Sequence, residues 1–317
     1  MRALVTGGAG FIGSHLVDAL VADGADVVVV DDLSTGDAAH LPAAADLLEG
    51  DVVDPGLLDR AAAGCDVVFH QAARRSVPQS VEHPLDTTRV NVDGTVNVLR
   101  AAQAAGVRRV VLASSSSVYG GAGPLPTPES VPLAPRSPYA VSKLAGEHFA
   151  RVWWEVHGLE TVCLRYFNAF GPRQSPESQY AAVIPLFISA LLAGEAPEVH
   201  GDGLQTRDFT YVGDAVAANL AAARAPAGAC AGRAYNVARG HPASLLDVLA
   251  LLGELTGAAV PPRHTPRRAG DVPRSHADIA AAAADLGYAP RVGLADGLER
   301  TLAWFRDRRP AAEVPAR

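Results

Sequence analysis

A tyrosine and a lysine four residues apart are the clearest chemical signal in the sequence. Tyr139 and Lys143 follow Ser137 and Pro138, a residue pair typical of a helix N-cap and first helical position. The two side chains should therefore lie one turn apart on one helix face. A nearby ammonium favours the phenolate over the ordinary tyrosine pKa of about 10. The pair alone also fits an ordinary amphipathic helix, but its chemistry suits a base that takes a hydroxyl proton while hydride leaves the same carbon.

A run of four serines, Ser114 to Ser117, follows a β-branched segment upstream of this helix. Serine runs are usually loops. Here the run ends an expected parallel strand at its carboxyl edge, where open sheets bind ligands. One of these hydroxyls can hydrogen-bond the reacting oxygen and pass on its proton, so we expect one serine of the run to act together with Tyr139 and Lys143.

Glycines near the N-terminus predict the partner in hydride transfer. The run Gly7-Gly8-Ala9-Gly10-Phe11-Ile12-Gly13 lies between an expected strand and an expected helix, the context that a dinucleotide-binding turn requires. Gly7 turns the chain, Gly10 lets backbone approach a pyrophosphate, and Gly13 lets the helix pack on the sheet, while the helix N-terminus attracts the anion. Phe11 and Ile12 of this turn are expected to contact the same cofactor.

Carboxylates at the ends of the next strands indicate which dinucleotide binds. Asp31 ends the second strand, where it can accept hydrogen bonds from the adenosine ribose and repel a 2′-phosphate, so NAD is favoured over NADP. Asp32 can contact the same ribose or be merely solvated, and Asp51 is placed to bind adenine. His70 is expected to be structural. The other expected cofactor contacts near these strand ends are Val52, Gln71, Ala72 and Ala73.

Composition limits the alternatives. The chain has 317 residues, of which 49% are hydrophobic and 19% charged, as in globular proteins. Lys and Arg (27) are outnumbered by Asp and Glu (34), so there is no case for nucleic-acid binding. Cys65, Cys163 and Cys230 form no CxxC pair, which argues against a metal site or disulfides and fits a reducing cytosol. With no secretion signal and no apolar run long enough for a membrane span, we expect a cytoplasmic protein without membrane partners.

The alternation of β-branched and helical segments predicts a Rossmann-type α/β fold, a doubly wound parallel sheet. The expected strands are Ala3 to Val5, Val27 to Val30, Val67 to Phe69, Val110 to Ala113 and Thr161 to Arg165, and the expected helices are Ile12 to Ala22, Asp54 to Ala63, Leu85 to Ala105 and Pro138 to His157.

A smaller C-terminal substrate-binding lobe should pack over the carboxyl ends of the strands. We expect residues 1–165 to form the NAD-binding domain, with 207–238 returning to it, and residues 166–206 and 239–317 to form the lobe. The later predicted elements are strands at Phe209 to Val212 and Ala234 to Val237, and helices at Tyr180 to Ala193, Leu245 to Leu255, Asp278 to Leu286 and Leu294 to Arg306.

These motifs in this order resemble the extended short-chain dehydrogenase/reductase family, in particular its NAD-dependent nucleotide-sugar 4-epimerases of the UDP-glucose and UDP-N-acetylglucosamine type. The resemblance covers nearly the whole chain. It implies that Ser115 is the serine that acts with Tyr139 and Lys143 as a catalytic triad. It also implies a tightly bound, recycled NAD, with two arginines flanking the diphosphate of a UDP-sugar. The cofactor contacts that it adds are Asn91 and Tyr166, and the implied substrate contacts are Arg75, Ser116, Ser117, Asn168, Val183, Ile184, Val199, Arg207, Arg268, Asp271 and Ser275.

Four positions set this chain apart within the resemblance. Arg75 follows Arg74 where galactose epimerases have a lysine, so it can meet a sugar hydroxyl, a phosphate or a uronic-acid carboxylate. Ser116 and Ser117 stand where the family's dehydratases carry acids, so water elimination would lack its acid. Ser275 stands where enzymes restricted to glucose and galactose carry a large tyrosine, which implies room for a 2-acetamido group; the alternative is that Ser275 only caps the helix near Asp278.

We therefore expect an isomerase that epimerises UDP-GlcNAc/UDP-GalNAc, and also UDP-Glc/UDP-Gal, at C4 through a transient 4-keto sugar. The alternatives are another NAD-dependent conversion, such as UDP-glucuronate epimerisation, dehydration or reduction, or a non-catalytic NAD-sensing module. A homodimer is also expected, built by the helices at Leu85 to Ala105 and Pro138 to His157, with Trp153 or Trp154 outside the intramolecular face.

Overall fold

The computed structural model describes residues 1–121, 123–176, 182–258, 260–267 and 272–308. Its centre is a seven-stranded sheet in the order β11-β6-β5-β4-β1-β2-β3, in which every pairing is parallel. The order reverses at β1, so the carboxyl ends of β1 and β4 flank a crevice that suits a ligand. The strands are β1 (Arg2–Thr6), β2 (Asp26–Asp31), β3 (Ala45–Glu49), β4 (Val67–His70), β5 (Arg109–Ser115), β6 (Glu160–Tyr166) and β11 (Arg233–Val237).

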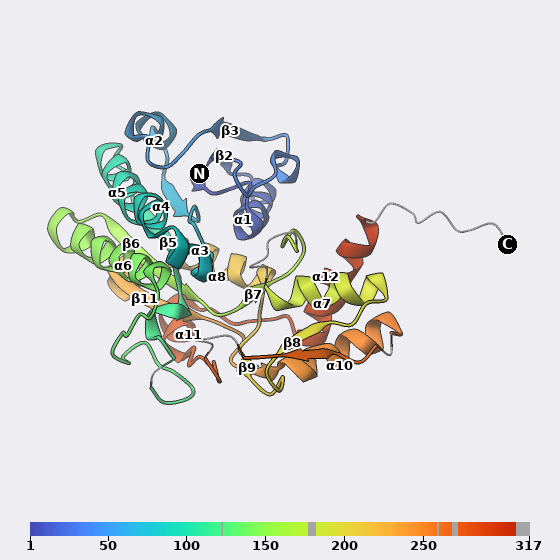
Figure 1. Cartoon of the computed structure of the whole chain (residues 1–317). Helices are drawn as coiled ribbons and strands as arrows, with labels where there is room; N and C mark the ends of the chain where they lie inside the picture. The colour runs from blue at the N-terminus through green and yellow to red at the C-terminus, as the bar shows by residue number, and fades with distance from the viewer. Residues whose placement is uncertain (122, 177–181, 259, 268–271, 309–317) are drawn as a thin grey trace.

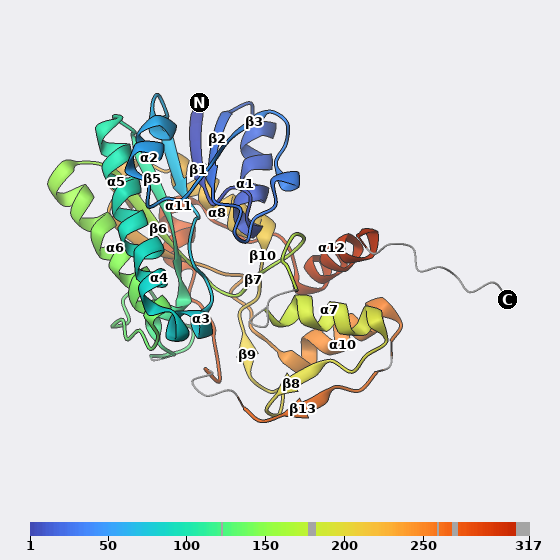
Figure 2. The same cartoon turned by 45° about the horizontal axis from the view of Figure 1, so that its top comes forward.

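Helices cover both faces of this sheet, which confirms the doubly wound fold (Figure 1). One face packs against α1 (Phe11–Ala22), α8 (Val212–Arg224) and α11 (Ala280–Leu286). The other packs against α2 (Pro55–Ala62), α5 (Gly94–Ala104) and α6 (Pro138–His157), which lie together on one side in Figure 2. Because both faces are covered, β1, β2, β4 and β5 are apolar on both sides, as the sequence pattern predicted.

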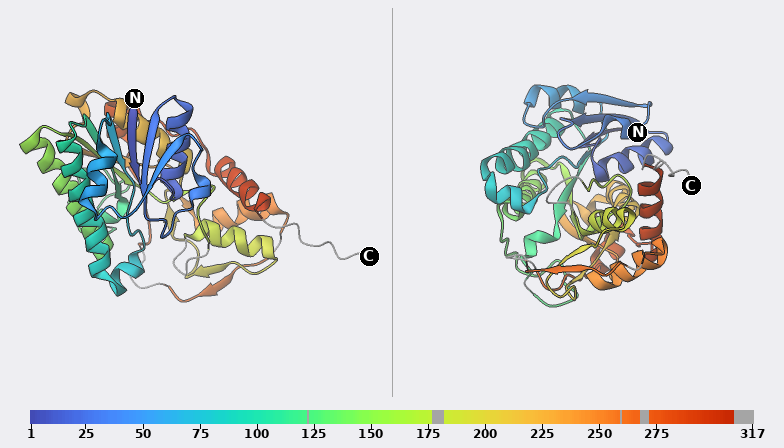
Figure 3. Two further views of the ribbon diagram at one scale, coloured as in Figure 1. Left: turned by 90° about the horizontal axis from the view of Figure 1, so that it is seen from above. Right: turned by 45° about the vertical axis from the view of Figure 1, so that its right-hand side comes forward.

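A second apolar core lies beyond the carboxyl ends of the strands (Figure 3). It joins Ile184, Phe187, Val248, Leu298 and Leu302 from three helices. The elements of this smaller lobe are α7 (Val183–Ala193), β8 (Glu198–His200), α10 (Leu245–Thr256), β13 (Arg263–Thr265) and α12 (Leu294–Asp307).

Several short elements lie between the main strands and helices. Between β4 and α5 the chain forms α3 (Val77–Glu82), α4 (Pro84–Thr88) and a π-helical segment (Arg89–Asp93), so the single helix expected over Leu85 to Ala105 is in fact interrupted. The remaining short elements are η1 (Ala38–His40), η3 (Ser116–Tyr119), β7 (Ala169–Phe170), β9 (Thr206–Arg207), β10 (Thr210–Tyr211), α9 (Ala227–Cys230) and β12 (Ala243–Ser244).

The prediction that Phe209 to Val212 forms a strand of the main sheet was wrong. Only Thr210–Tyr211 is extended, and it pairs with β7 instead, while Val212 begins α8. The sequence interpretation missed α8 because this helix is rich in alanine and also buries Asp214 and Asn219. Asp214 accepts hydrogen bonds from the backbone of Arg291 and Val292, so burial of this carboxylate does not leave it unpaired.

The helix expected near Asp278 lies on the sheet rather than in the lobe. Ala282 and Leu286 of α11 join the core shared by α1 and α8. Residues 280–286 therefore pack with the first domain, although the expected division assigned all of 239–317 to the lobe.

Candidate active site

The glycine turn forms a close backbone cradle at the end of β1. Gly7 has φ of +70°, and a Cβ there would lie 2.6 Å from the backbone nitrogen of Ala72. A Cβ on Gly13 would lie 2.0 Å from the carbonyl oxygen of Gly7. Gly10 is the N-cap of α1 and has no side chain to block approach to the first amides of the helix. This arrangement fits a pyrophosphate.

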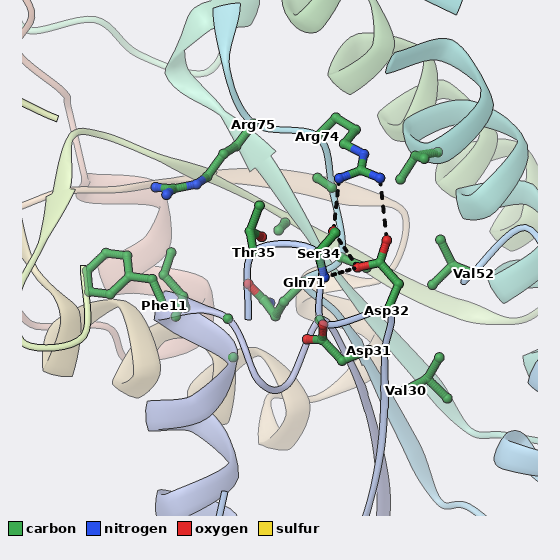
Figure 4. Close-up of a pocket in the computed structure, with 18 of the residues that line it drawn as sticks. Phe11, Val30, Asp31, Asp32, Ser34, Thr35, Val52, Gln71, Arg74 and Arg75 are labelled. Atoms are coloured by element: carbon green, nitrogen blue, oxygen red, sulfur yellow. Dashed lines mark hydrogen bonds and ion pairs between the residues drawn. The ribbon is translucent and has the colours of Figure 1, made fainter. Parts of the chain in front are cut away.

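Two adjacent carboxylates line one end of the groove that continues from this cradle (Figure 4). Asp31 is 7% exposed and accepts hydrogen bonds of 2.9 Å from the backbone of Ala9 and of Leu33. Burial raises the pKa of Asp31, and these backbone donors oppose the shift. Asp32 instead accepts from the Ser34 hydroxyl at 2.5 Å and pairs with Arg74 at 3.4 Å.

The groove brings together nearly all of the predicted cofactor residues, although they come from separate parts of the chain. From the glycine turn to the catalytic helix, the predicted residues that line it are Gly7, Gly10, Phe11, Ile12, Gly13, Asp31, Asp32, Asp51, Val52, Gln71, Ala72, Ala73, Tyr139, Lys143 and Tyr166.

Asn91 is the exception. Its carboxamide accepts a hydrogen bond from the backbone nitrogen of Arg74 at 2.8 Å and donates to the carbonyl of Arg74 and to the Ser142 hydroxyl. The side chain is 3% exposed and does not line the groove. Asn91 therefore fixes the loop after β4 against α6 instead of facing the cofactor groove.

His70 is structural, as expected. Its two ring nitrogens lie 2.7 Å from the hydroxyl of Thr6 and 3.0 Å from that of Thr95. Burial lowers the pKa of His70 to about 3, so the ring is neutral at physiological pH and does not supply a catalytic proton.

The predicted triad assembles where α6 crosses the end of β5. Ser137 caps α6 by accepting a hydrogen bond from the backbone of Ala140 at 3.1 Å. The Ser115 side chain lies beside Tyr139 and lowers its pKa as a hydrogen-bonding neighbour, and Lys143 Nζ donates to the carbonyl of Ala113 at 2.8 Å. Lys143 Nζ also lies 6.0 Å from the centre of the Tyr139 ring. A proton acceptor and two polar partners therefore stand at one sheet edge.

Burial and the neighbouring groups shift the pKa values of Tyr139 and Lys143 in opposite directions. Burial raises the pKa of Tyr139, whereas the Ser115 hydrogen bond and the Arg75 charge lower it. Burial lowers the pKa of Lys143 to about 8, against the influence of Cys163 and Glu147. A positive nicotinamide would add a further charge that favours the phenolate.

Tyr166 belongs to a second polar group that the sequence analysis identified only in part. Its hydroxyl accepts a hydrogen bond from Asn219 at 2.7 Å and donates to the Gln71 carboxamide at 3.3 Å. Burial raises the pKa of Tyr166 to about 12, so it stays protonated. Asn219 was missed because it lies in α8, a helix that was not predicted. The signal available in the sequence was an asparagine within an alanine-rich segment.

A second pocket adjoins the groove at the triad. Arg75, Tyr139 and Tyr166 line both hollows. The predicted residues that line this substrate pocket are Arg75, Ser115, Ser116, Ser117, Asn168, Arg207 and Ser275. A third pocket shares Asn168 and Arg207 with it and contains the predicted Val183 and Ile184.

Val199 was wrongly expected to contact substrate. Its side chain is fully buried in the core of the lobe, while its strand neighbours Glu198 and His200 line the third pocket. Successive side chains of a strand point to opposite faces, so the prediction was one residue out of phase. Arg268 and Asp271 lie outside the described residues.

Other pocket residues went unnoticed. Arg136 and Arg274 line the substrate pocket, and Gln205 lines the third pocket with its Oε1 buried and without a hydrogen-bond partner. Arg136 had a usable signal, since it directly precedes the N-cap of the catalytic helix. Arg274 and Gln205 could be placed only by the fold.

Two searches of the described residues returned nothing. No helix there is long and apolar enough to cross a membrane. No cluster of three or more His, Cys, Asp or Glu side chains in the described part of the chain is arranged to hold a metal ion.

Comparison with known proteins identifies the family. Residues 3–238 match the model of the NAD dependent epimerase/dehydratase family. The chain belongs to this family. A UDP-glucose 4-epimerase of Mycolicibacterium smegmatis is 42% identical over 315 residues, covering 97% of this chain and 99% of the relative.

Solved structures of members of this family resemble the chain over nearly its whole length. A UDP-glucose 4-epimerase of Thermotoga maritima with UDP-glucose has a TM-score of 0.93 at 36% identity, covering 97% of this chain and 99% of the other. A UDP-N-acetylglucosamine 4-epimerase of Methanobrevibacter ruminantium in complex with UDP-N-acetylmuramic acid gives the same values. Other similar proteins are a dTDP-glucose 4,6-dehydratase of Streptomyces niveus, 36% identical over 325 residues and covering 98% of this chain and 94% of the relative, and a structure with UDP-glucuronic acid and NAD, 37% identical with a TM-score of 0.87 and covering 97% of this chain and 99% of the other. This member of the family is an NAD-dependent enzyme of the isomerase class.

Proposed function

We propose that the protein catalyses 4-epimerisation of a UDP-hexose, with UDP-GlcNAc and UDP-GalNAc among its substrates. The observation that carries the proposal is the position of Tyr139. It lines both the cofactor groove and the substrate pocket, with Ser115 and Lys143 as its polar partners. A sugar hydroxyl at this junction meets a base on one side and the nicotinamide end of the groove on the other.

Each catalytic residue has a separate role in this reaction. When bound, NAD accepts a hydride from C4 and returns it. Tyr139 takes the C4 hydroxyl proton as the hydride leaves, and gives it back when the ketone is reduced. Ser115 donates a hydrogen bond to the oxygen that gains charge. Lys143 stabilises the phenolate by its positive charge. Return of hydride to the opposite face inverts the configuration at C4.

Elimination of water has no matching support. Ser116 and Ser117, the residues after the catalytic serine, line the pocket and carry no acid. A carboxylic acid or carboxylate is the usual means of moving a proton at this step. We therefore favour epimerisation over dehydration, even though dehydratases are among the relatives.

Ser275 supports the 2-acetamido assignment. It lines the substrate pocket, and its backbone nitrogen donates to the carbonyl of Thr206 at 3.0 Å. It does not cap α11, whose N-cap is Ile279 and whose first turn is bonded by Asp278. The small side chain thus leaves space at the pocket wall, which a larger ring would fill at a strain cost of about 1 to 3 kcal/mol.

The test follows each UDP-sugar by NMR with no added reductant. We expect UDP-GlcNAc to give UDP-GalNAc, and the Ser275→Tyr variant to lose this activity by about tenfold or more while keeping UDP-glucose turnover. Inert UDP-GlcNAc, or an unchanged rate in Ser275→Tyr, would overturn the assignment.

A second candidate substrate is a sugar that carries a carboxylate. Four arginines, Arg75, Arg136, Arg207 and Arg274, line the substrate pocket, and no carboxylate stands among its described lining residues. Arg75 lines the same pocket as Tyr139, and its charge lowers the Tyr139 pKa, so it belongs to the end of the pocket where the reacting sugar is expected. Guanidinium groups suit bidentate binding of carboxylates.

The two candidates are separated by one variant. If a uronic acid is the substrate, Arg75→Gln should raise the KM for UDP-glucuronate by about tenfold or more and change the KM for UDP-GlcNAc little. Absence of UDP-glucuronate turnover in the unmodified protein would dismiss this candidate.

We also propose a homodimer, with a different surface signal from the one expected. Trp153 and Trp154 both contact their own chain, the first against the α2/α5 core and the second against Gly232. Several exposed large apolar side chains lie instead on α6 and its neighbours α3 and α4, and they are Val77, Val81, Leu85, Val141, Phe149, Val152 and Val156.

A second copy of the chain is the occupant that this stripe suits, because a two-fold axis would pair the same apolar helices. Light scattering at micromolar concentration should give a dimer mass, and Val152→Glu should give a monomer. A monomer mass for the unmodified protein would refute the dimer.

A further inference from the structure

Behind the triad, α6 and β5 are joined residue by residue. Tyr139, Lys143 and Glu147 stand four residues apart on one face of α6. Lys143 donates to the carbonyl of Ala113, and Glu147 accepts a hydrogen bond from Ser114. Tyr139 lies one turn before Lys143, beside Ser115, whose side chain lowers the Tyr139 pKa. Two hydrogen bonds thus hold the end of β5 against α6, next to the Ser115 and Tyr139 side chains.

Glu147 is itself held from the other side. Arg165 on β6 donates to its two carboxylate oxygens, from Nε at 2.9 Å and from Nη2 at 2.7 Å. Arg165 Nη1 donates to the Tyr119 hydroxyl at 2.8 Å, and Tyr119 donates to Asn236 at 2.7 Å. Glu147 and Arg165 are 9% and 5% exposed, so neither charge has much access to water.

A buried ion pair of this kind contributes little net stability compared with an apolar core, although breaking it is costly. What the ion pair contributes here is the orientation of the Glu147 carboxylate. Bidentate pairing fixes the carboxylate plane, and that plane fixes where the Ser114 hydroxyl must lie. Ser114 precedes Ser115 on an extended strand, so its position sets the position of the catalytic hydroxyl.

We propose that Ser114, Glu147 and Arg165 form a positioning clamp that sets β5 against α6 and so holds the Ser115 hydroxyl on Tyr139. The proposal rests on the epimerase chemistry proposed above. The clamp touches neither the reacting atoms nor the sugar pocket, and Ser114 alone of the three borders the cofactor groove.

Ser114→Ala is the mildest way to open the clamp, since Glu147 keeps both of its bonds to Arg165. We expect kcat to fall about tenfold, the loss of one well-aligned hydrogen bond, with KM within about twofold. Thr161→Val is the matched control. The Thr161 hydroxyl is also buried and bonds the carbonyl of Ala150 on α6 at 2.7 Å, but far from the triad. This control should keep its kcat even if its melting temperature falls as much.

The decisive measurement is the effect of Ser114→Ala on kcat in a protein that already carries Ser115→Ala. If the clamp acts through Ser115, adding Ser114→Ala to Ser115→Ala should change kcat by less than about twofold. An additive loss in that background, a near wild-type kcat in Ser114→Ala, or an equal kcat loss in Thr161→Val would each overturn the clamp. Failure of the proposed function is distinguishable, because unmodified protein would then fail to epimerise any UDP-sugar.

Discussion

The cofactor groove and the substrate pocket meet at Tyr139, yet they are built differently. The groove is formed largely by turns that follow β1, β2, β3 and β4, together with the ends of β5 and β6 and the first turns of α6, so most of its lining lies at the end of a strand or near the start of a helix. The substrate pocket gathers residues from six stretches between Arg75 and His276, several of them in loops. Chemistry is therefore set by local motifs at a sheet edge, whereas substrate choice depends on how distant segments are brought together.

The largest effect should come from the junction itself. Tyr139→Phe removes the proton acceptor and leaves the ring in place, so we expect turnover to fall about 10²- to 10⁴-fold while NAD stays bound. Turnover by NMR and the absorbance of bound cofactor check the two halves separately. A variant with near wild-type turnover would contradict the role of Tyr139.

The groove should depend on backbone approach. Gly13→Ala places a Cβ 2.0 Å from the Gly7 carbonyl, so the turn must shift, at a cost of about 1 to 3 kcal/mol in stability, and bound NAD should be lost on purification. Gly228→Ala, whose Cβ would meet nothing within 4 Å, is the control. Retention of full NAD content by Gly13→Ala would show that the cradle is not where we place it.

Two adjacent arginines, Arg74 and Arg75, should affect the rate differently. The Arg75 charge lowers the pKa of Tyr139, so Arg75→Gln should raise that pKa and move the rising limb of the rate to higher pH. Arg74→Gln should leave the limb in place, because Arg74 pairs with Asp32 instead. A pH profile of kcat for both variants checks this, and an equal shift in the two would remove the distinction.

The smallest effect is expected at the outer edge of the groove. Asp32→Asn breaks a partly exposed ion pair with Arg74, an interaction usually worth under about 1 kcal/mol, so NAD affinity should change only a few-fold. Asp31→Asn alters a buried carboxylate and should weaken NAD binding far more. Calorimetric titration of NAD into cofactor-free protein checks both; equal effects would mean that Asp32, too, holds the ribose.

The same contrast explains what the sequence could predict. The glycine turn, Asp31, Tyr139 and Lys143 could be predicted to line one groove because each lies at a fixed offset from a strand or a helix cap. Val199 and Asn91 do not line the expected pockets, because a strand phase and a side-chain direction are not set by such offsets. Arg136 was missed although it directly precedes the N-cap of α6. Arg274 and Asn219 were not singled out because they reach the site only through the packing of the segment before α11 and of α8 onto the sheet.

Helix α8 shows the physical limit most clearly. Its alanines pack closely in the core under β5 and β6, so it has no wide polar face to give a clear period. Its Asp214 and Asn219 serve buried hydrogen bonds, a role that only the folded chain defines.

The most direct test of the account is whether the protein, with its own NAD and no added reductant, interconverts C4 epimers of a UDP-hexose. Proton NMR of UDP-GlcNAc incubated with the purified protein should show UDP-GalNAc accumulating to a fixed ratio, reached from either epimer, and Tyr139→Phe should slow the approach to it. Recovery of unchanged sugar from every UDP-hexose tried, or release of a stable keto sugar with loss of water, would contradict it.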